Sequence, residues 1–78
     1  MNVQTRIEAK LAESLDLQHL EVSNESGNHN VPDGAESHFK VVLVADAFDG
    51  LPLIRRHRTV NRILSDELDL IHALALHT

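Results

Sequence analysis

The sequence contains no cysteine. Disulfide bonds, thiolate catalysis and a zinc or iron–sulfur site made from the chain's own Cys ligands are therefore excluded. The sequence has no Trp or Tyr and only two Phe, so its core must be built from Leu, Val and Ile. No apolar run approaches the length of a membrane span, and the N-terminal residues lack the shape of a signal peptide. We therefore expect a soluble, cytoplasmic protein without membrane partners.

Seventy-eight residues are enough for one small domain, which we expect to span residues 1–78. A chain of this size buries only roughly 60–65% of the surface that its unfolded form exposes. Its large apolar side chains are needed for packing, which leaves little room for an enclosed substrate cavity. The serines lie in no nucleophile-elbow sequence, and the three glycines form no phosphate-binding loop. These observations argue against an enzyme.

The net charge of −5 is unevenly distributed. The first 37 residues contain seven acidic side chains against Arg6 and Lys10, whereas the other residues contain five of each sign. One group of basic residues has no acidic residue within it: Arg55, Arg56, Arg58 and Arg62. An acidic chain lacks the general attraction to phosphate that dominates nucleic-acid affinity. Four arginines on one helix could still contact an acidic partner or DNA locally, and a solvated helix face is the alternative.

Apolar residues that recur every four positions predict an amphipathic helix at the N-terminus, with Asn2 as its N-cap. These residues are Val3, Ile7, Leu11 and Leu15. After a break at residues 16–18, the alternation at residues 20–23 predicts a short strand. The segment Glu25–Glu36 is rich in Gly, Pro, Asn and Asp, which predicts a loop. Loops of this length in a compact domain are often functional.

The sequence pattern in the second half of the chain predicts a strand, a helix and another strand. Residues 37–46 contain the unbroken apolar run 41–45, which is typical of a central strand. A turn at residues 48–50 precedes a predicted helix from Pro52 to about Leu68. Its apolar stripe contains Leu53, His57, Val60, Leu64 and either Glu67 or Leu68. The pattern of residues 70–78 predicts a third strand. It leaves open which face of this strand meets the helices.

This order of elements, αββαβ, predicts a single α/β (α+β) domain. The first two strands form an antiparallel hairpin, and a right-handed crossover makes the second and third strands parallel. If they are neighbours, the sheet order is 1-2-3, with both helices on one face. The topology then brings three histidines to one edge of the sheet: His29 in the loop, His38 at the start of the second strand and His72 near the start of the third.

Imidazoles gathered at one edge suggest an incomplete metal site, because imidazole is a good ligand for iron, zinc and copper. With no thiolate in the chain, an iron–sulfur cluster would need its sulfur ligands from another molecule. The alternative is that these are surface or hydrogen-bonding residues, which is how we interpret His19 and His77. We interpret His57, on the apolar stripe of the helix, as a half-buried packing residue.

The run from Glu25 to Thr78 resembles the BolA family, and residues 6–11 resemble the first helix of that family. The residues that carry the resemblance are Glu25-Ser26, His29-Asn30-Val31-Pro32, Gly34, Glu36-Ser37-His38-Phe39-Lys40-Val41-Val42-Leu43-Val44, Phe48, Gly50, Arg56-His57-Arg58, Glu67-Leu68 and His72-Ala73-Leu74-Ala75-Leu76-His77-Thr78. The matching run covers about two-thirds of the chain with few gaps. The resemblance implies an αββαβ domain similar to the class II KH fold.

The resemblance also implies a partner and a cofactor. The partner is a monothiol glutaredoxin, with which the protein, a monomer alone, forms a heterodimer. The cofactor is a [2Fe–2S] cluster shared with glutaredoxin and glutathione, and absent from the isolated protein. The metal ligands would be His72, at the family's invariant position, and His29, at its variable loop position. The expected contacts with a partner or nucleic acid are Arg55, Arg56, Arg58 and His38.

Two departures from the family pattern bear on these expectations. The Gly-x-x-G loop with which KH domains clamp a nucleic-acid backbone is absent. Relatives also usually continue beyond the position of Thr78 through a Tyr-Thr segment toward a Trp. Bacterial members of the family are nevertheless described as transcriptional regulators of morphology and stress response. A DNA-binding regulator is therefore the alternative to an iron–sulfur adaptor, and an interaction module without metal is the third hypothesis.

Overall fold

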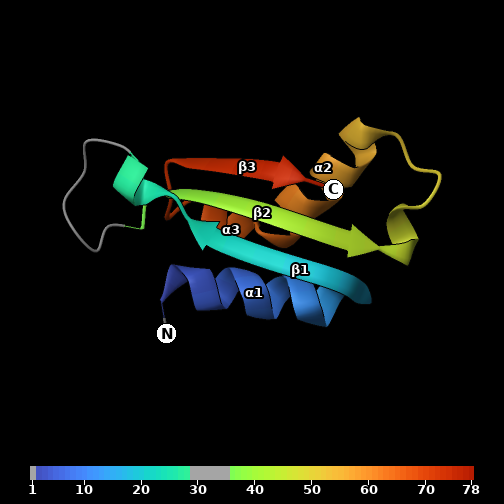
Figure 1. The fold of residues 1–78 in the computed structure, drawn as a ribbon, viewed down its shortest axis with the longest axis horizontal. Helices are drawn as coiled ribbons and strands as arrows, with labels where there is room; N and C mark the ends of the chain where they lie inside the picture. Colours follow the sequence, from blue (N-terminus) through green and yellow to red (C-terminus); the bar gives the residue numbers. More distant parts are fainter. Residues whose placement is uncertain (1, 29–35) are drawn as a thin grey trace.

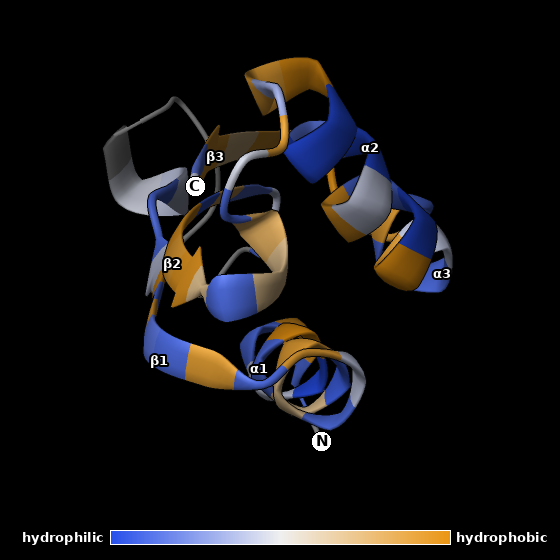
Figure 2. Ribbon diagram, turned by 90° about the vertical axis from the view of Figure 1, so that its right-hand side faces the viewer, coloured by the Kyte–Doolittle hydropathy of each residue, from blue (hydrophilic) through white to orange (hydrophobic). Residues whose placement is uncertain are grey.

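The computed structural model describes residues 2–28 and 36–78. Its elements are α1 (Val3–Ser14), β1 (Leu17–Asn24), η1 (Ser26–Asn28), β2 (His38–Ala45), η2 (Asp46–Phe48), α2 (Leu53–Ile63), α3 (Ser65–Leu68) and β3 (Ala73–His77). The strands form one sheet in the order β1-β2-β3, in which β2 is antiparallel to β1 and parallel to β3. The helices lie on one side of this sheet (Figures 1 and 2). The predicted α/β domain, strand order and strand directions are confirmed.

Helix α1 begins where the sequence predicts, because the Asn2 side chain accepts a hydrogen bond from the Thr5 backbone N–H at 2.8 Å. Ile7 and Leu11 are fully buried against the sheet. The first strand is longer than predicted, since β1 begins at Leu17 instead of Leu20. The pairing register shifts between Leu17 and His19. Such a bulge interrupts the alternation of side chains, so the pattern does not reveal this part of the strand.

The sheet has one covered and one open face. On the covered side, β2 buries Phe39, Val41, Leu43 and Ala45. The side chains of β3 that pack on the same core are Leu74 and Leu76, whereas Ala73, Ala75 and His77 are exposed. The packing therefore selects the Leu74–Leu76 face of β3, a choice that the sequence pattern left open.

The single helix predicted from Pro52 to about Leu68 is divided into α2 and α3 at Leu64 (φ −96°, ψ 16°). Helix α2 packs on the core through its C-terminal half, where Val60 is buried, and Leu64 follows it into the core. Leu53, predicted on the apolar stripe, is 59% exposed because it lies in the first turn, away from this contact. The third strand is shorter than predicted, and Leu70 is exposed in the turn after α3.

No helix in residues 2–28 and 36–78 is long and apolar enough to cross a membrane.

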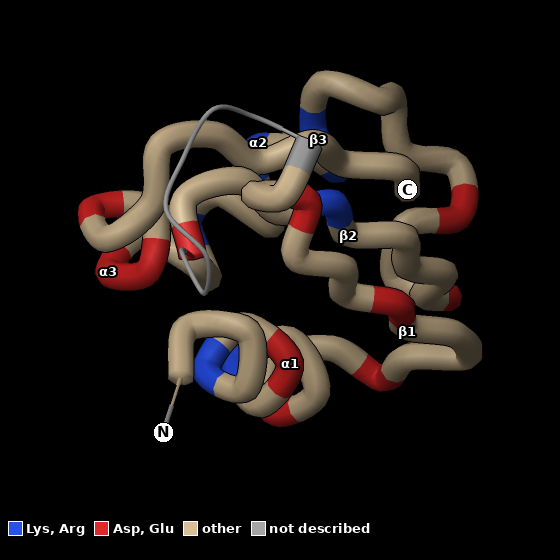
Figure 3. Tube along the Cα trace, turned by 60° about the vertical axis from the view of Figure 1, so that its left-hand side comes forward, with Lys and Arg blue, Asp and Glu red and all other residues tan. Residues whose placement is uncertain are grey.

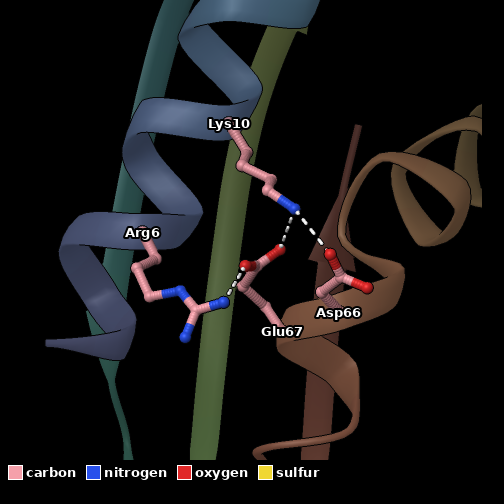
Figure 4. A network of polar contacts seen from close by, with 4 residues as sticks. All are labelled: Arg6, Lys10, Asp66 and Glu67. Atoms are coloured by element: carbon pink, nitrogen blue, oxygen red, sulfur yellow. Dashed lines mark hydrogen bonds and ion pairs between the residues drawn. The ribbon is translucent and has the colours of Figure 1, made fainter.

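A cluster of charges joins α1 to α3 (Figure 4). Arg6 Nη2 donates to Glu67 Oε2 at 2.9 Å, and Lys10 Nζ lies 3.1 Å from Glu67 Oε1 and 3.4 Å from Asp66 Oδ2. The sequence left open whether Glu67 or Leu68 completes the apolar stripe of the helix, and the structure buries the Glu67 side chain completely, at 0% exposed. A buried carboxylate needs such partners, since an isolated buried charge is strongly unfavourable.

The hydrogen bond with Glu67 is the main cause that raises the pKa of Lys10 above its ordinary value of 10.5. Desolvation opposes it, and the hydrogen bond with Asp66 and the attraction of both carboxylates add to it. The stabilisation by this pair is therefore fully present below the ordinary pKa and is lost as the pH rises through the raised value.

We expect Arg6→Met to lower the free energy of unfolding by about 2–3 kcal/mol, because it removes one of the cations that compensate the buried Glu67 carboxylate. Arg6 is 39% exposed, which keeps the cost below that of a fully buried pair. Glu67→Met removes the buried charge itself, so we expect a change of only about 1 kcal/mol. Urea denaturation measures both, with the exposed Glu13→Met as the control. A larger loss for Glu67→Met than for Arg6→Met would contradict this explanation.

Candidate functional site

Two of the three histidines predicted at one sheet edge lie side by side. His38 is the first residue of β2, and His72 comes directly before β3. Because these strands are parallel, their starts lie at the same edge, where His38 pairs with Ala73. The two imidazole ring centroids are 5.2 Å apart, with 49° between the ring planes. The third histidine, His29, lies outside the described residues.

His72 presents an exposed side chain on a restrained backbone. It does not belong to the strand itself, as the sequence suggested, but precedes it by one residue. Its backbone N–H donates to the Ser37 carbonyl at 2.7 Å, and the N–H of Ala73 donates to the same oxygen at 3.0 Å. The backbone of His72 is therefore held to the start of β2 while its imidazole remains accessible to solvent.

His38 is half-buried and belongs to a network of serine contacts. The Ser37 hydroxyl lies 2.8 Å from His38 Nδ1. The buried Ser26 hydroxyl accepts the backbone N–H of His38 at 3.1 Å and that of Ser37 at 2.9 Å. Sequence reasoning considered both serines only as nucleophiles and missed this role. Their position at the two ends of the predicted loop was the available signal.

The side chains of His38 and His72 can supply part of the ligand set of a metal site, but not a complete set. Among residues 2–28 and 36–78, no group of three or more His, Cys, Asp or Glu side chains could hold a metal ion. A [2Fe–2S] cluster takes four protein ligands, which are usually thiolates and are in part imidazoles in some centres. His72 and His38 can supply only imidazole. The described part of the chain therefore fits a [2Fe–2S] cluster only if another molecule supplies thiolates.

The remaining histidines lie away from this edge. His19 and His77 are exposed, and His19 Nε2 is 3.5 Å from Glu21 Oε1. His57 is half-buried on α2, in agreement with the predicted packing role. Its Nε2 atom is buried without a hydrogen-bond partner among the residues that the structure describes.

The arginines of α2 differ in what they contact. Arg55, Arg58 and Arg62 are exposed. Arg56 instead donates from Nε to the Leu51 carbonyl at 2.8 Å and from Nη1 to the Thr78 carbonyl at 3.0 Å. A contact of Arg56 with a partner stays a prediction; within the fold its guanidinium joins the segment before α2 to the residue after β3. Acidic residues lie along α1, β1 and α3 (Figure 3).

An open hollow of about 260 Å³ adjoins Arg56 at the carboxyl end of β2. Asp46, Asp49 and Thr78 are among the residues that line it. This hollow lies at the opposite end of β2 and β3 from His38 and His72, so it belongs to a different part of the surface from the histidine pair.

A family model described as BolA-like protein matches residues 11–78. The chain belongs to the BolA family. It is 53% identical over 77 residues to the DNA-binding transcriptional regulator BolA of Vibrio cholerae, covering 97% of this chain and 73% of that protein. It is 52% identical over 79 residues to the protein of the same name from Escherichia coli, covering 100% and 75%. These BolA relatives are named as regulators, not as enzymes.

The fold comparison agrees with the family assignment. The structure of BolA1 from Arabidopsis thaliana has a TM-score of 0.90 to this chain at 35% identity, covering 99% of this chain and 89% of that one. The αββαβ arrangement described above is therefore that of solved BolA proteins.

The half-buried position of His57 has a consequence for stability. We expect His57→Leu to raise the melting temperature, because leucine fills the site without burying a nitrogen that lacks a described partner, at a gain of about 1 kcal/mol. His57→Ala should lower it, because the smaller side chain leaves a space. Thermal unfolding followed by circular dichroism measures both, with the exposed His19→Leu as the control. A lower melting temperature for His57→Leu than for His57→Ala would show that the imidazole has a polar role.

Proposed function

We propose that this protein is a non-enzymatic adaptor that supplies the imidazole of His72, together with that of His29, to a [2Fe–2S] cluster shared with a monothiol glutaredoxin and glutathione. The observation that carries the proposal is the exposed His72 side chain on a backbone held by hydrogen bonds to the Ser37 carbonyl. When bound, the cluster supplies iron atoms that accept both thiolate and imidazole ligands.

The local structure supports a ligand role for His72 in two ways. Its backbone is already ordered, so binding costs less conformational entropy than it would for a residue in an unrestrained segment. Its ring also lies at the outer edge of the sheet beside His38, so a partner's thiolates can approach without any opening of the core. Both features are expected of a chain that completes a ligand set on another protein.

We expect His72→Ala to abolish the visible circular dichroism of the shared cluster, or to convert it to that of glutaredoxin alone. The reason is that alanine removes the nitrogen ligand at the restrained position. The matched control is His77→Ala, which removes an exposed imidazole from the far end of β3. The measurement is the spectrum of this protein mixed with a glutathione-loaded glutaredoxin cluster.

Three further measurements extend this test. His29→Ala should alter the spectrum and speed cluster loss, and His29→Cys should retain a cluster with shifted bands, because thiolate donates more strongly than imidazole. The protein incubated with iron and sulfide alone, then desalted, should be colourless. A wild-type spectrum from His72→Ala, or loss of the spectrum in His77→Ala alone, would refute the ligand assignment.

DNA binding is a second candidate function, favoured by two observations. The Vibrio cholerae and Escherichia coli relatives are named DNA-binding regulators. The exposed residues Arg55, Arg58 and Arg62 are spaced i, i+3 and i+7, which places them on one side of α2. This stripe is the surface that we propose for phosphate contacts.

If the stripe contacts DNA, Arg58→Glu should weaken binding and reduce the dependence on salt, by about 0.9 in log–log slope for each phosphate that the variant no longer neutralises. The matched control is Lys40→Glu, which changes the net charge equally but lies on β2. Fluorescence anisotropy with labelled duplex at several salt concentrations measures both variants. Equal losses in the two variants would mean that only the overall charge matters, and binding that is insensitive to salt would refute phosphate contacts.

A further inference from the structure

We propose that Ser26 is a positioning residue for the histidine pair, which its hydroxyl orients by holding the peptide between Ser37 and His38. This role rests on the proposed cluster-sharing function, and the placement of the imidazole rings can be tested without any cluster. Neither the sequence comparison nor the ligand assignment above gives Ser26 a role.

Ser26 is a buried polar residue whose hydroxyl is fully used. It is 3% exposed and is the first residue of η1, which follows β1 after one intervening residue. Its Oγ accepts the backbone N–H groups of Ser37 at 2.9 Å and His38 at 3.1 Å. The same oxygen lies 3.5 Å from the His38 carbonyl and 3.4 Å from the Ser37 hydroxyl. One side chain therefore holds the N–H of the Ser37–His38 peptide and also contacts the backbone groups on either side of this peptide, the Ser37 N–H and the His38 carbonyl.

That peptide unit in turn places both imidazoles. The Ser37 hydroxyl contacts His38 Nδ1 at 2.8 Å, which restrains the orientation of this ring. The Ser37 carbonyl accepts the N–H groups of His72 and Ala73, which sets where β3 begins. A tilt of the Ser37–His38 peptide would therefore move the His38 ring and the His72 backbone together.

Other contacts hold Ser26 itself in place, which makes it a suitable anchor. Its backbone N–H donates to Asn24 Oδ1 at 3.0 Å, and the N–H of Glu25 donates to the His38 carbonyl at 2.8 Å. These bonds tie the end of β1 to the start of β2. The contact between Ser26 and Ser37 also joins the two ends of the segment that contains His29 in the sequence.

Loss of the hydroxyl has a direct structural consequence. Ser26→Ala would leave the half-buried N–H groups of Ser37 and His38 without this acceptor. Buried backbone donors find other partners when theirs is removed, so the peptide must move or admit water. Either change alters the relative position of the two rings without removing any part of the apolar core.

The first experiment uses the isolated protein, labelled with ¹⁵N, and follows the ring nitrogens of His38 and His72 and the amide of His72 by NMR. We expect Ser26→Ala to shift all three and to change the tautomer population of His38, while Ser26→Thr, which keeps the hydroxyl, restores them. The control is Ser23→Ala, which removes an exposed hydroxyl from β1. Unchanged ring and amide signals in a folded Ser26→Ala would overturn the proposal.

A measurement on the wild-type protein decides the case even if Ser26→Ala does not fold. The amides of Ser37 and His38 should exchange slowly with solvent, because both donate to the buried Ser26 hydroxyl; rapid exchange would overturn the proposal. Ser37→Ala, which removes the hydroxyl contacts with the His38 ring and with Ser26 Oγ but keeps the backbone bonds, should shift His38 and leave the His72 amide in place. A shift of His72 alone would contradict the proposed order of contacts.

The second experiment measures the lifetime of the cluster shared with glutaredoxin. We expect Ser26→Ala to shorten it about tenfold, as is usual when a residue that orients a metal ligand is removed, and Ser23→Ala to leave it unchanged. An unchanged lifetime in Ser26→Ala would overturn the positioning role. If the wild-type protein forms no shared cluster at all, the proposed function fails, whereas the NMR result on Ser26 still stands by itself.

Discussion

The start of the parallel pair β2–β3 is the constraint on which the arrangement of this site depends. Two strands that run in the same direction begin at the same edge, so His38 and His72 become neighbours although they are far apart in the sequence. The Ser37 carbonyl makes the connection by accepting two consecutive backbone N–H groups, those of His72 and Ala73. This junction therefore determines that the two histidines are neighbours, and it sets where β3 begins to pack on the core.

The Glu67 carboxylate and the His72 imidazole have contrasting surroundings. The Glu67 carboxylate is fully buried and receives Arg6 and Lys10 from another helix, so its charge is compensated within the domain. The His72 imidazole is exposed, and the described residues around it do not complete a metal site. The first arrangement joins α1 to α3, whereas the second leaves a ligand available to another molecule. The same small fold thus separates the contacts that stabilise it from the group that we propose for its function.

The arginines of α2 fall into two groups in the structure, according to what they contact. All of them are candidates for a partner contact when only their sequence is considered. In the structure Arg56 bonds to the nearby Leu51 carbonyl and, across the fold, to the Thr78 carbonyl, and the three exposed arginines form a stripe. The stripe lies on a chain whose net charge is negative, so any contact with phosphate must be local and sensitive to salt.

The sequence by itself determined the class of the protein and the order of its elements. The four-residue repeat around Ile7 and Leu11 predicts α1, and the alternation from Phe39 to Ala45 predicts β2, because each period matches the geometry of its element. The crossover helix predicts that β3 is parallel to β2, and this direction places His38 and His72 at one edge of the sheet. Local periodicity and connection rules are sufficient for such statements, since periodicity depends on neighbouring residues and the connection rules depend on the order of the elements.

Tertiary structure decided what depends on contacts between distant segments. Leu53 fits the apolar stripe of its helix but is exposed, because only the C-terminal half of α2 packs on the core. The pattern leaves open whether Glu67 belongs to that stripe, and it is buried because Arg6 and Lys10 of α1 compensate its charge. Ser26 is placed by the sequence only at one end of the predicted loop, since its role arises where the end of β1 meets the start of β2. These are pairings across the fold, and no periodicity along the chain encodes them.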